Sequence, residues 1–112
     1  MSYETKKIKN AMVVAIPKEI MQEDVEALRE ALSGVLASGC RQVVLDMTSC
    51  PYITSMALSA IFHEKKRFVE AGGDIKIACI NALIQNLLDL TNLAKAIDIY
   101  AEVREAADAF GG

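Results

Sequence analysis

The chain has 112 residues and is 53% hydrophobic, which suits one domain, residues 1–112, with a sizeable core. Its formal net charge of -3, with acidic and basic residues interspersed, argues against a broad nucleic-acid surface. No apolar run approaches the roughly 18 residues that cross a membrane, and no apolar stretch follows the charged segment MSYETKKIKN as it would in a signal peptide. We therefore expect a cytoplasmic protein that neither inserts into a membrane nor binds nucleic acid.

The first half of the chain reads as two strands, a helix and a central strand. Residues 3–9 form a weak strand and Ala11–Ile16 a stronger one. Apolar residues recur at helical spacing from Met21 to Ser38, and Gly39 suits the C-terminal end of that helix. Arg41–Met47 is apolar almost throughout, which is typical of a strand that is covered on both faces.

The second half continues the alternation of helices and strands. After the loop TSCPYI, a helix is predicted from Ser55 to Ala71 and ends at Gly72–Asp74. The elements that follow are a strand IKIACI, a helix Ala82–Leu90, a strand AIDIY and a last helix Glu102–Phe110. Strands that alternate with helices imply right-handed crossovers. The predicted fold class is therefore α/β, with a mostly parallel sheet packed against four helices.

The same periodicity predicts which side chains face the core. Met21, Val69 and Leu83 lie on apolar stripes and are expected to be buried with their neighbours. The charge run EKKR, Glu64–Arg67, is expected to form a solvated helix face. Three cysteines lack C-x-x-C spacing, which favours free thiols over a metal site or a disulfide; they are Cys40, Cys50 and Cys79.

The sequence carries no signature of catalysis. The only histidine, His63, lies eight residues after Ser55, about 12 Å along a helix, which is too far for it to activate that serine as a base. The glycines match neither G-x-x-x-x-G-K nor G-x-G-x-x-G, and no serine lies in G-x-S-x-G. Asp46, Asp74 and Asp98 fall at or near strand positions without a metal-site signature. We therefore expect no enzyme activity, metal or cofactor.

The segment VVLDMTSCPYITSMAL resembles the central segment of STAS domains, the family that includes bacterial anti-sigma factor antagonists. LDMT is similar to the family's strand end, Leu-Asp-Leu-Ser, and Tyr52-Ile53 to its aromatic-aliphatic pair. Ser55 falls on the family's phosphorylated serine and Leu58 on its leucine. AGGDIKIACI and LIQNLLDLTNLAKAIDIYAEVREAADAF resemble the later parts of the family pattern, so the resemblance spans nearly the whole chain.

The resemblance implies a STAS fold and a binding function. An antagonist of this kind binds an anti-sigma factor serine kinase and thereby frees a sigma factor, until phosphorylation of Ser55 releases the kinase. Thr54 is a second candidate acceptor, and the implied partner-binding residues are Asp46, Thr54, Ser55, Met56 and Ala57. The free N–H groups at a helix start would tolerate the phosphate, whereas its charge of about -1.5 to -2 would repel a docked partner.

Four positions depart from the family pattern. Thr54 stands where the family has Asp, Met56 where it has Ser, and both Ala57 and Asn92 where it has Gly. The departures at Thr54, Met56 and Ala57 favour an alternative, a STAS interaction module without phosphorylation in a signalling or lipid-transport assembly.

Two further alternatives come from single features of the sequence. Thr54 and Ser55 could serve only to start the helix, since both residue types are preferred N-caps. The C-terminal Gly-Gly suggests a sulfur-carrier or conjugation protein, but the helical pattern up to Phe110 leaves no extended tail.

Overall fold

The structure is a computed structural model that describes residues 3–111. The strands are β1 (Glu4–Ile8), β2 (Ala11–Ala15), β3 (Gln42–Asp46), β4 (Asp74–Ala78) and β5 (Ile99–Tyr100). The helices are α1 (Val25–Ala37), α2 (Ser55–Glu70), α3 (Ala82–Leu90) and α4 (Val103–Ala109), and the 3-10 turns η1 (Gln22–Asp24) and η2 (Leu93–Lys95) precede α1 and β5. The predicted order of strands and helices is confirmed.

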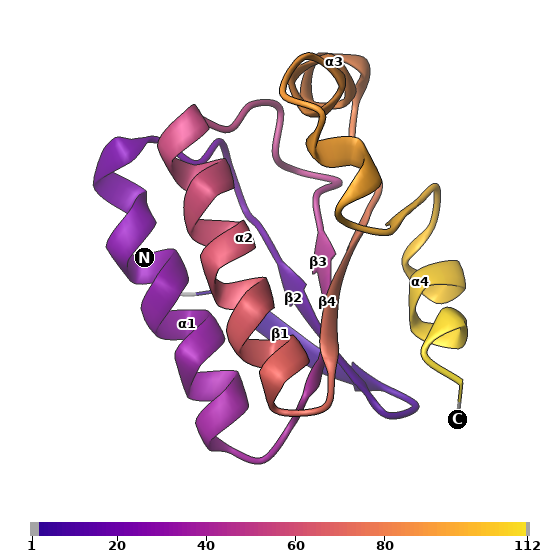
Figure 1. The fold of residues 1–112 in the computed structure, drawn as a ribbon. Coiled ribbons are helices and arrows are strands. Elements are labelled where there is room, and N and C mark those ends of the chain that lie inside the picture. The colour runs from indigo at the N-terminus through magenta and orange to yellow at the C-terminus, as the bar shows by residue number, and fades with distance from the viewer. Residues whose placement is uncertain (1–2, 112) are drawn as a thin grey trace.

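The five strands form one sheet in the order β1-β2-β3-β4-β5. β1 is antiparallel to β2, and the other neighbours are parallel. Helices α1 and α2 lie side by side on one face of the sheet, whereas α4 lies against the other face (Figure 1). Helix α3 lies beyond the carboxyl ends of the parallel strands (Figure 1). The mostly parallel sheet with four helices is therefore confirmed.

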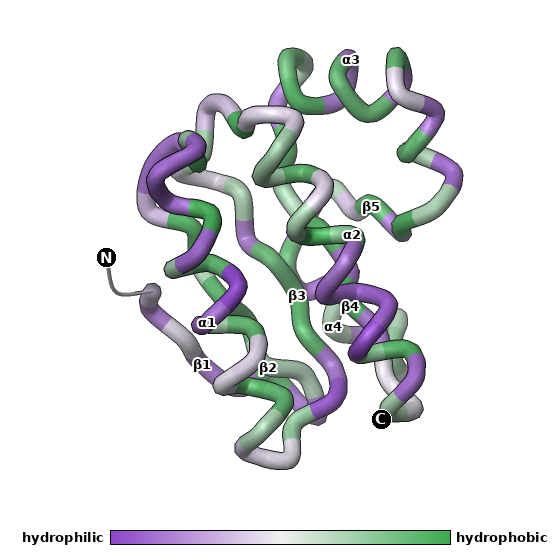
Figure 2. Tube along the Cα trace, turned by 60° about the vertical axis from the view of Figure 1, so that its left-hand side comes forward, coloured by the Kyte–Doolittle hydropathy of each residue, from purple (hydrophilic) through white to green (hydrophobic). Residues whose placement is uncertain are grey.

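The central strand β3 is buried on both faces, as its continuous apolar sequence predicts. Val43 and Leu45 pack with α1 and α2 in the larger core cluster. Val44, between them, packs with Ala106 and Ala107 of α4 in a second cluster. Figure 2 shows β3 in hydrophobic green along most of its length. Because successive strand residues point to opposite faces, one short strand supports both layers of helices.

The end of α4 is held to the sheet by a cation-π contact as well as by apolar packing. Lys76 on β4 is 7% exposed, and its Nζ lies 2.6 Å from Oδ2 of Asp98. The same ammonium lies 4.9 Å from the centre of the Phe110 ring and 5.6 Å from that of Tyr100. Aromatic faces attract a cation at such distances. These contacts explain how a lysine is accommodated under the C-terminal helix.

Several side chains lie differently from their expected places. Met21, Val69 and Leu83 were expected in the core but are 37%, 50% and 54% exposed. Met21 lies outside the apolar stripe of α1, because α1 begins only at Val25 after the turn η1. The other two lie beside buried neighbours, Phe68 and Ile84, on faces that no element covers.

Glu64 is the opposite case. It belongs to the charge run that was expected to be solvated, yet it is 1% exposed. It lies three residues after Ile61 and four before Phe68, both of which are fully buried. Residues at this spacing share one face of a helix, so Glu64 is turned inward with them. The run is therefore not a uniform solvated face.

Candidate functional site

The start of α2 is tied to the start of α1 by a short parallel bridge. Ile20 N–H donates to the Tyr52 carbonyl at 3.0 Å, and Thr54 N–H donates to the Ile20 carbonyl at 3.1 Å. Ile20 and Ile53 are both buried at this bridge. The two helices therefore begin side by side, at the end of the sheet to which the parallel strands point (Figure 1).

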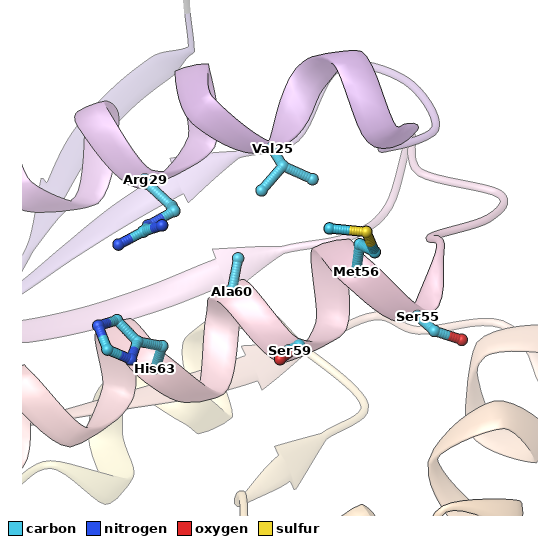
Figure 3. Close-up of a pocket in the computed structure, with 7 residues that line it drawn as sticks. All are labelled: Val25, Arg29, Ser55, Met56, Ser59, Ala60 and His63. Carbon is cyan, nitrogen blue, oxygen red and sulfur yellow. The ribbon is translucent and has the colours of Figure 1, made fainter.

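The two hydroxyl residues at the start of α2 have different environments. Thr54 is the N-cap residue, with extended backbone, and its Oγ1 accepts a hydrogen bond from Ala57 N–H at 3.1 Å. Ser55, the first helical residue, is exposed, and its hydroxyl points away from the groove between α1 and α2 (Figure 3). Thr54 therefore satisfies the free N–H of the helix start, and the Ser55 hydroxyl is not needed for capping.

Apolar side chains are exposed around Ser55. Met56 is 56% exposed and lies beside Val25 of α1 (Figure 3). Met21 and Tyr52, next to the bridge that joins the two helix starts, are 37% and 42% exposed. The loop before α2 is also tied to α3, whose N-cap Asn81 donates through Nδ2 to the Pro51 carbonyl at 2.9 Å. We call Met21, Tyr52 and Met56 the apolar margin of Ser55.

The structure brings four of the five predicted partner-binding residues together. Thr54, Ser55, Met56 and Ala57 are consecutive, but Ala57 is fully buried, so its side chain packs in the core. Asp46 lies elsewhere. It follows Leu45 on β3 and shares a shallow pocket with Val13 and Lys6, on the face of the sheet that α4 covers in part.

The carboxylate of Asp46 has a local structural role. Its Oδ1 accepts a hydrogen bond from Thr48 N–H at 3.0 Å, and the Thr48 hydroxyl donates to the same oxygen. An aspartate that accepts from the backbone two residues later forms a turn of its own. Asp46 therefore turns the chain from β3 into the loop that leads to α2, and acts on the site through that loop.

The loop before α2 also contains a buried thiol. Cys50 is 2% exposed and its Sγ donates to the Tyr52 carbonyl at 3.4 Å. Burial raises the pKa of this thiol, so the reactive thiolate is disfavoured at neutral pH. Cys50 thus acts as a small core residue that supports the loop. The cysteines among residues 3–111 are free, and no group of His, Cys, Asp and Glu in this range could hold a metal ion.

A groove between α1 and α2 starts at this site. It encloses about 400 Å³ and is lined by Val25, Arg29, Ser55, Met56, Ser59, Ala60 and His63 (Figure 3). Sequence reasoning did not find it, because it depends on which faces of the two helices meet. One signal in the sequence points to it: Glu64 falls at the helical spacing of the buried residues of α2. A buried carboxylate there needs a cation from a neighbouring helix, and Arg29 of α1 provides it.

The fold and the site define a small α/β domain that presents an exposed serine, Ser55, and an apolar margin at a helix start. A family model of the STAS domain matches residues 2–106, so the chain belongs to the STAS domain family. None of the curated proteins matches the sequence significantly. In residues 3–111, the helices are all too short or too polar to span a membrane.

Several solved structures share this fold. An anti-sigma factor antagonist from Mycobacterium paratuberculosis superposes with a TM-score of 0.87 at 19% identity, covering 99% of this chain and 94% of that one. The phosphorylated form of the Bacillus cell fate determinant SpoIIAA gives 0.73 at 13% identity, covering 96% and 98%. A sulfate transporter family protein from Wolinella succinogenes gives 0.74 at 13% identity, covering 91% and 85%. At these identities the likeness shows the fold.

Proposed function

We propose that this single-domain STAS protein is a cytoplasmic anti-sigma factor antagonist without catalytic activity. It binds an anti-sigma factor serine kinase at the apolar margin and frees the sigma factor, and phosphorylation of Ser55 ends the binding. Two of the structures with this fold are an anti-sigma factor antagonist and the phosphorylated form of the Bacillus cell fate determinant SpoIIAA. The observation that carries the proposal is the division of roles between Thr54, which caps α2, and Ser55, which is free.

This division lets a phosphate act on the partner and not on the fold. Ser55 is the first residue of α2, where unpaired backbone N–H groups and the helix dipole favour negative charge. The cap does not have to break, because it belongs to Thr54. A partner packed on Met56 and Tyr52 would instead face a dianion at the centre of its contact. The modification would therefore weaken docking while α2 stays folded.

The cognate anti-sigma factor serine kinase and Mg-ATP provide the test. Intact mass should increase by one phosphoryl group, and fragmentation should place it on Ser55. Ser55→Ala should stay unmodified but still bind the kinase. Thr54→Ala serves as the matched control: it removes the neighbouring hydroxyl and leaves the acceptor in place. Modification of Thr54→Ala but not of Ser55→Ala supports Ser55, and the reverse pattern would make Thr54 the acceptor.

A STAS interaction module without phosphorylation is the second candidate. Thr54 in place of the family's Asp leaves no carboxylate next to Ser55, and the fold is shared with a sulfate transporter family protein. The antagonist proposal fails if the chain stays unmodified and does not bind the kinase, either with or without bound nucleotide. Co-purification with a membrane-transport or signalling subunit, abolished by Met56→Glu in the apolar margin, would then support the second candidate.

A further inference from the structure

A second polar site lies further along the groove between α1 and α2. Val25 and Met56 form the end of the groove near Ser55, and Arg29 and His63 form the other end. In Figure 3, Arg29 of α1 and His63 of α2 face each other across the gap between the helices. His63 is exposed, and the Arg29 side chain is 43% exposed. This end of the groove therefore offers nitrogen donors that solvent can reach.

A buried carboxylate fixes the arginine in place. The Glu64 side chain is 1% exposed, and its Oε1 accepts from Arg67 Nη1 at 2.9 Å and from the Ser33 hydroxyl at 3.2 Å. Its Oε2 lies 3.7 Å from Arg29 Nε. Within residues 3–111, Oε2 accepts no hydrogen bond. A buried carboxylate needs cations close by. Glu64 therefore attracts Arg29, which lines the groove, and pairs with Arg67, which lies outside its lining.

The cluster keeps a positive charge after this pairing. Two guanidinium groups oppose one carboxylate, and the Arg67 side chain is 46% exposed. Arg29 approaches Glu64 through Nε, and its terminal N–H groups have no protein acceptor in the described part of the chain. Glu30 follows Arg29 in sequence but lines a different pocket, with Tyr3 and Met12 on the β1 side of α1. No described acidic residue other than Glu64 pairs with Arg29.

We propose that Arg29 and His63 bind an oxyanion, the phosphate or carboxylate group of a ligand, in this groove. A planar guanidinium presents parallel N–H donors that match two oxygens of such a group, and the imidazole adds a further donor. Glu64 is the positioning residue for Arg29. Val25 and Met56 fit an apolar part of the same ligand.

The polar end of this site lies away from the proposed switch at Ser55, whereas its apolar end shares Met56 with the apolar margin. His63 lies eight residues beyond Ser55 on α2, a rise of about 12 Å. Binding at Arg29 and His63 therefore requires neither a kinase nor a modified serine. The two proposals can fail independently, because the oxyanion test uses the unmodified chain alone.

His63 provides a direct readout, because it is the only histidine in the chain. Its imidazole Hε1 proton is followed by NMR while inorganic phosphate is added at constant ionic strength and pH; acetate is titrated in a second arm and chloride in a third. If only phosphate produces a saturable shift, the ligand carries a phosphate group. If acetate also produces a saturable shift, the ligand carries a carboxylate group. Equal, linear shifts with all three anions would overturn the proposal.

Matched variants show whether the two residues form the site. Arg29→Gln should weaken phosphate binding by about tenfold, since a charge-assisted hydrogen bond is lost. Lys95→Gln removes an exposed cation from the turn η2, away from the groove, and should leave binding unchanged. His63→Gln, with the Ala60 amide as reporter, tests the second donor at an exposed position where folding is not at risk. Wild-type affinity in both Arg29→Gln and His63→Gln would rule the site out.

Discussion

Thr54 Oγ1 accepts a hydrogen bond from Ala57 N–H at 3.1 Å, and this bond makes Thr54, not Ser55, the residue that caps α2. The finding separates two roles that the sequence could not assign. A side chain committed to capping is a poor acceptor for phosphate, because modification would remove the hydrogen bond that holds the helix start. Ser55 has no such commitment, which makes it the better switch of the two hydroxyls.

Because Thr54 caps α2 and Ser55 does not, the two residues should contribute unequally to stability. We expect Thr54→Ala to lower the free energy of unfolding by about 1 kcal/mol, as loss of an N-cap hydrogen bond does. Ser55→Ala should change it by less than about 0.5 kcal/mol, since an exposed side chain without a special contact is lost. Urea denaturation of both variants beside the wild type measures the difference. A larger loss for Ser55→Ala would mean that the serine is the cap.

The adjacent residues Phe68 and Val69 allow the effect of an alanine substitution to be compared between the buried and the exposed face of α2. Phe68 is fully buried, so Phe68→Ala should destabilise the protein by about 3–5 kcal/mol through the cavity it leaves. Val69 is 50% exposed, and Val69→Ala should stay within about 0.5 kcal/mol of the wild type. Thermal or chemical unfolding compares them. Comparable losses at the two positions would indicate that something covers the outer face of α2.

Two glycines are expected to respond in opposite directions to alanine. A Cβ atom on Gly73 would overlap the backbone carbonyl of Arg41, to which Asp74 N–H also donates at 3.0 Å. Gly73→Ala should therefore be strongly destabilising, because it displaces the start of β4 from β3. Gly34 lies inside α1 with open space around it, and Gly34→Ala should stabilise the helix by about 0.5–1 kcal/mol. Melting temperatures that fall for Gly73→Ala and rise for Gly34→Ala would agree with this geometry; no change at Gly73 would contradict it.

The ion pair between Lys76 and Asp98 should make stability depend on pH. The hydrogen bond from Lys76 lowers the pKa of Asp98 below its ordinary value. A carboxyl whose pKa is lower in the folded state stabilises the fold above its unfolded pKa, and that contribution is lost as the pH falls through the folded pKa. The side chain of Asp98 is 59% exposed, so we expect less than about 1 kcal/mol. Asp98→Asn should therefore flatten the acid side of the stability profile.

The basic side of the profile follows from Lys76. Burial lowers the pKa of Lys76, but the hydrogen bond and charge of Asp98 outweigh it and raise the pKa above its ordinary value. An amine with a raised folded pKa stabilises the fold below its unfolded pKa, and this contribution disappears as the pH rises through the folded pKa. Urea unfolding from acidic to strongly basic pH measures the acid and the basic sides of the stability profile. Asp89→Asn, at an exposed position on α3, is the control and should leave both sides in place.

Local patterns were enough to predict the order of elements. Strand-like runs such as Arg41–Met47 and the helical spacing after Ser55 are properties of short segments, so they can be read without knowing the neighbours. The alternation then implies a mostly parallel sheet. The resemblance at Leu45–Leu58 identified the family and pointed to Ser55. The predicted order of elements and the mostly parallel sheet depend on chain order alone, and the structure agrees with both.

Which side of a helix is covered depends on packing between distant segments. The sequence gives Phe68 and Val69 similar hydrophobicity, but only the first faces the sheet. Glu64 is buried because α1 brings Arg29 and Ser33 against α2, more than thirty residues away in the chain. No pattern within one helix can contain that information, because it depends on the crossing of two.

The sequence by itself therefore determined the family, the α/β architecture and the serine at the start of α2. The tertiary structure decided which residues around that serine are buried, exposed or used for capping. It assigned the cap to Thr54, placed Asp46 on the other face of the sheet, and exposed Met21, Tyr52 and Met56 beside Ser55. The physical reason is that capping and exposure depend on where the bridge between Ile20 and Ile53 positions the two helix starts.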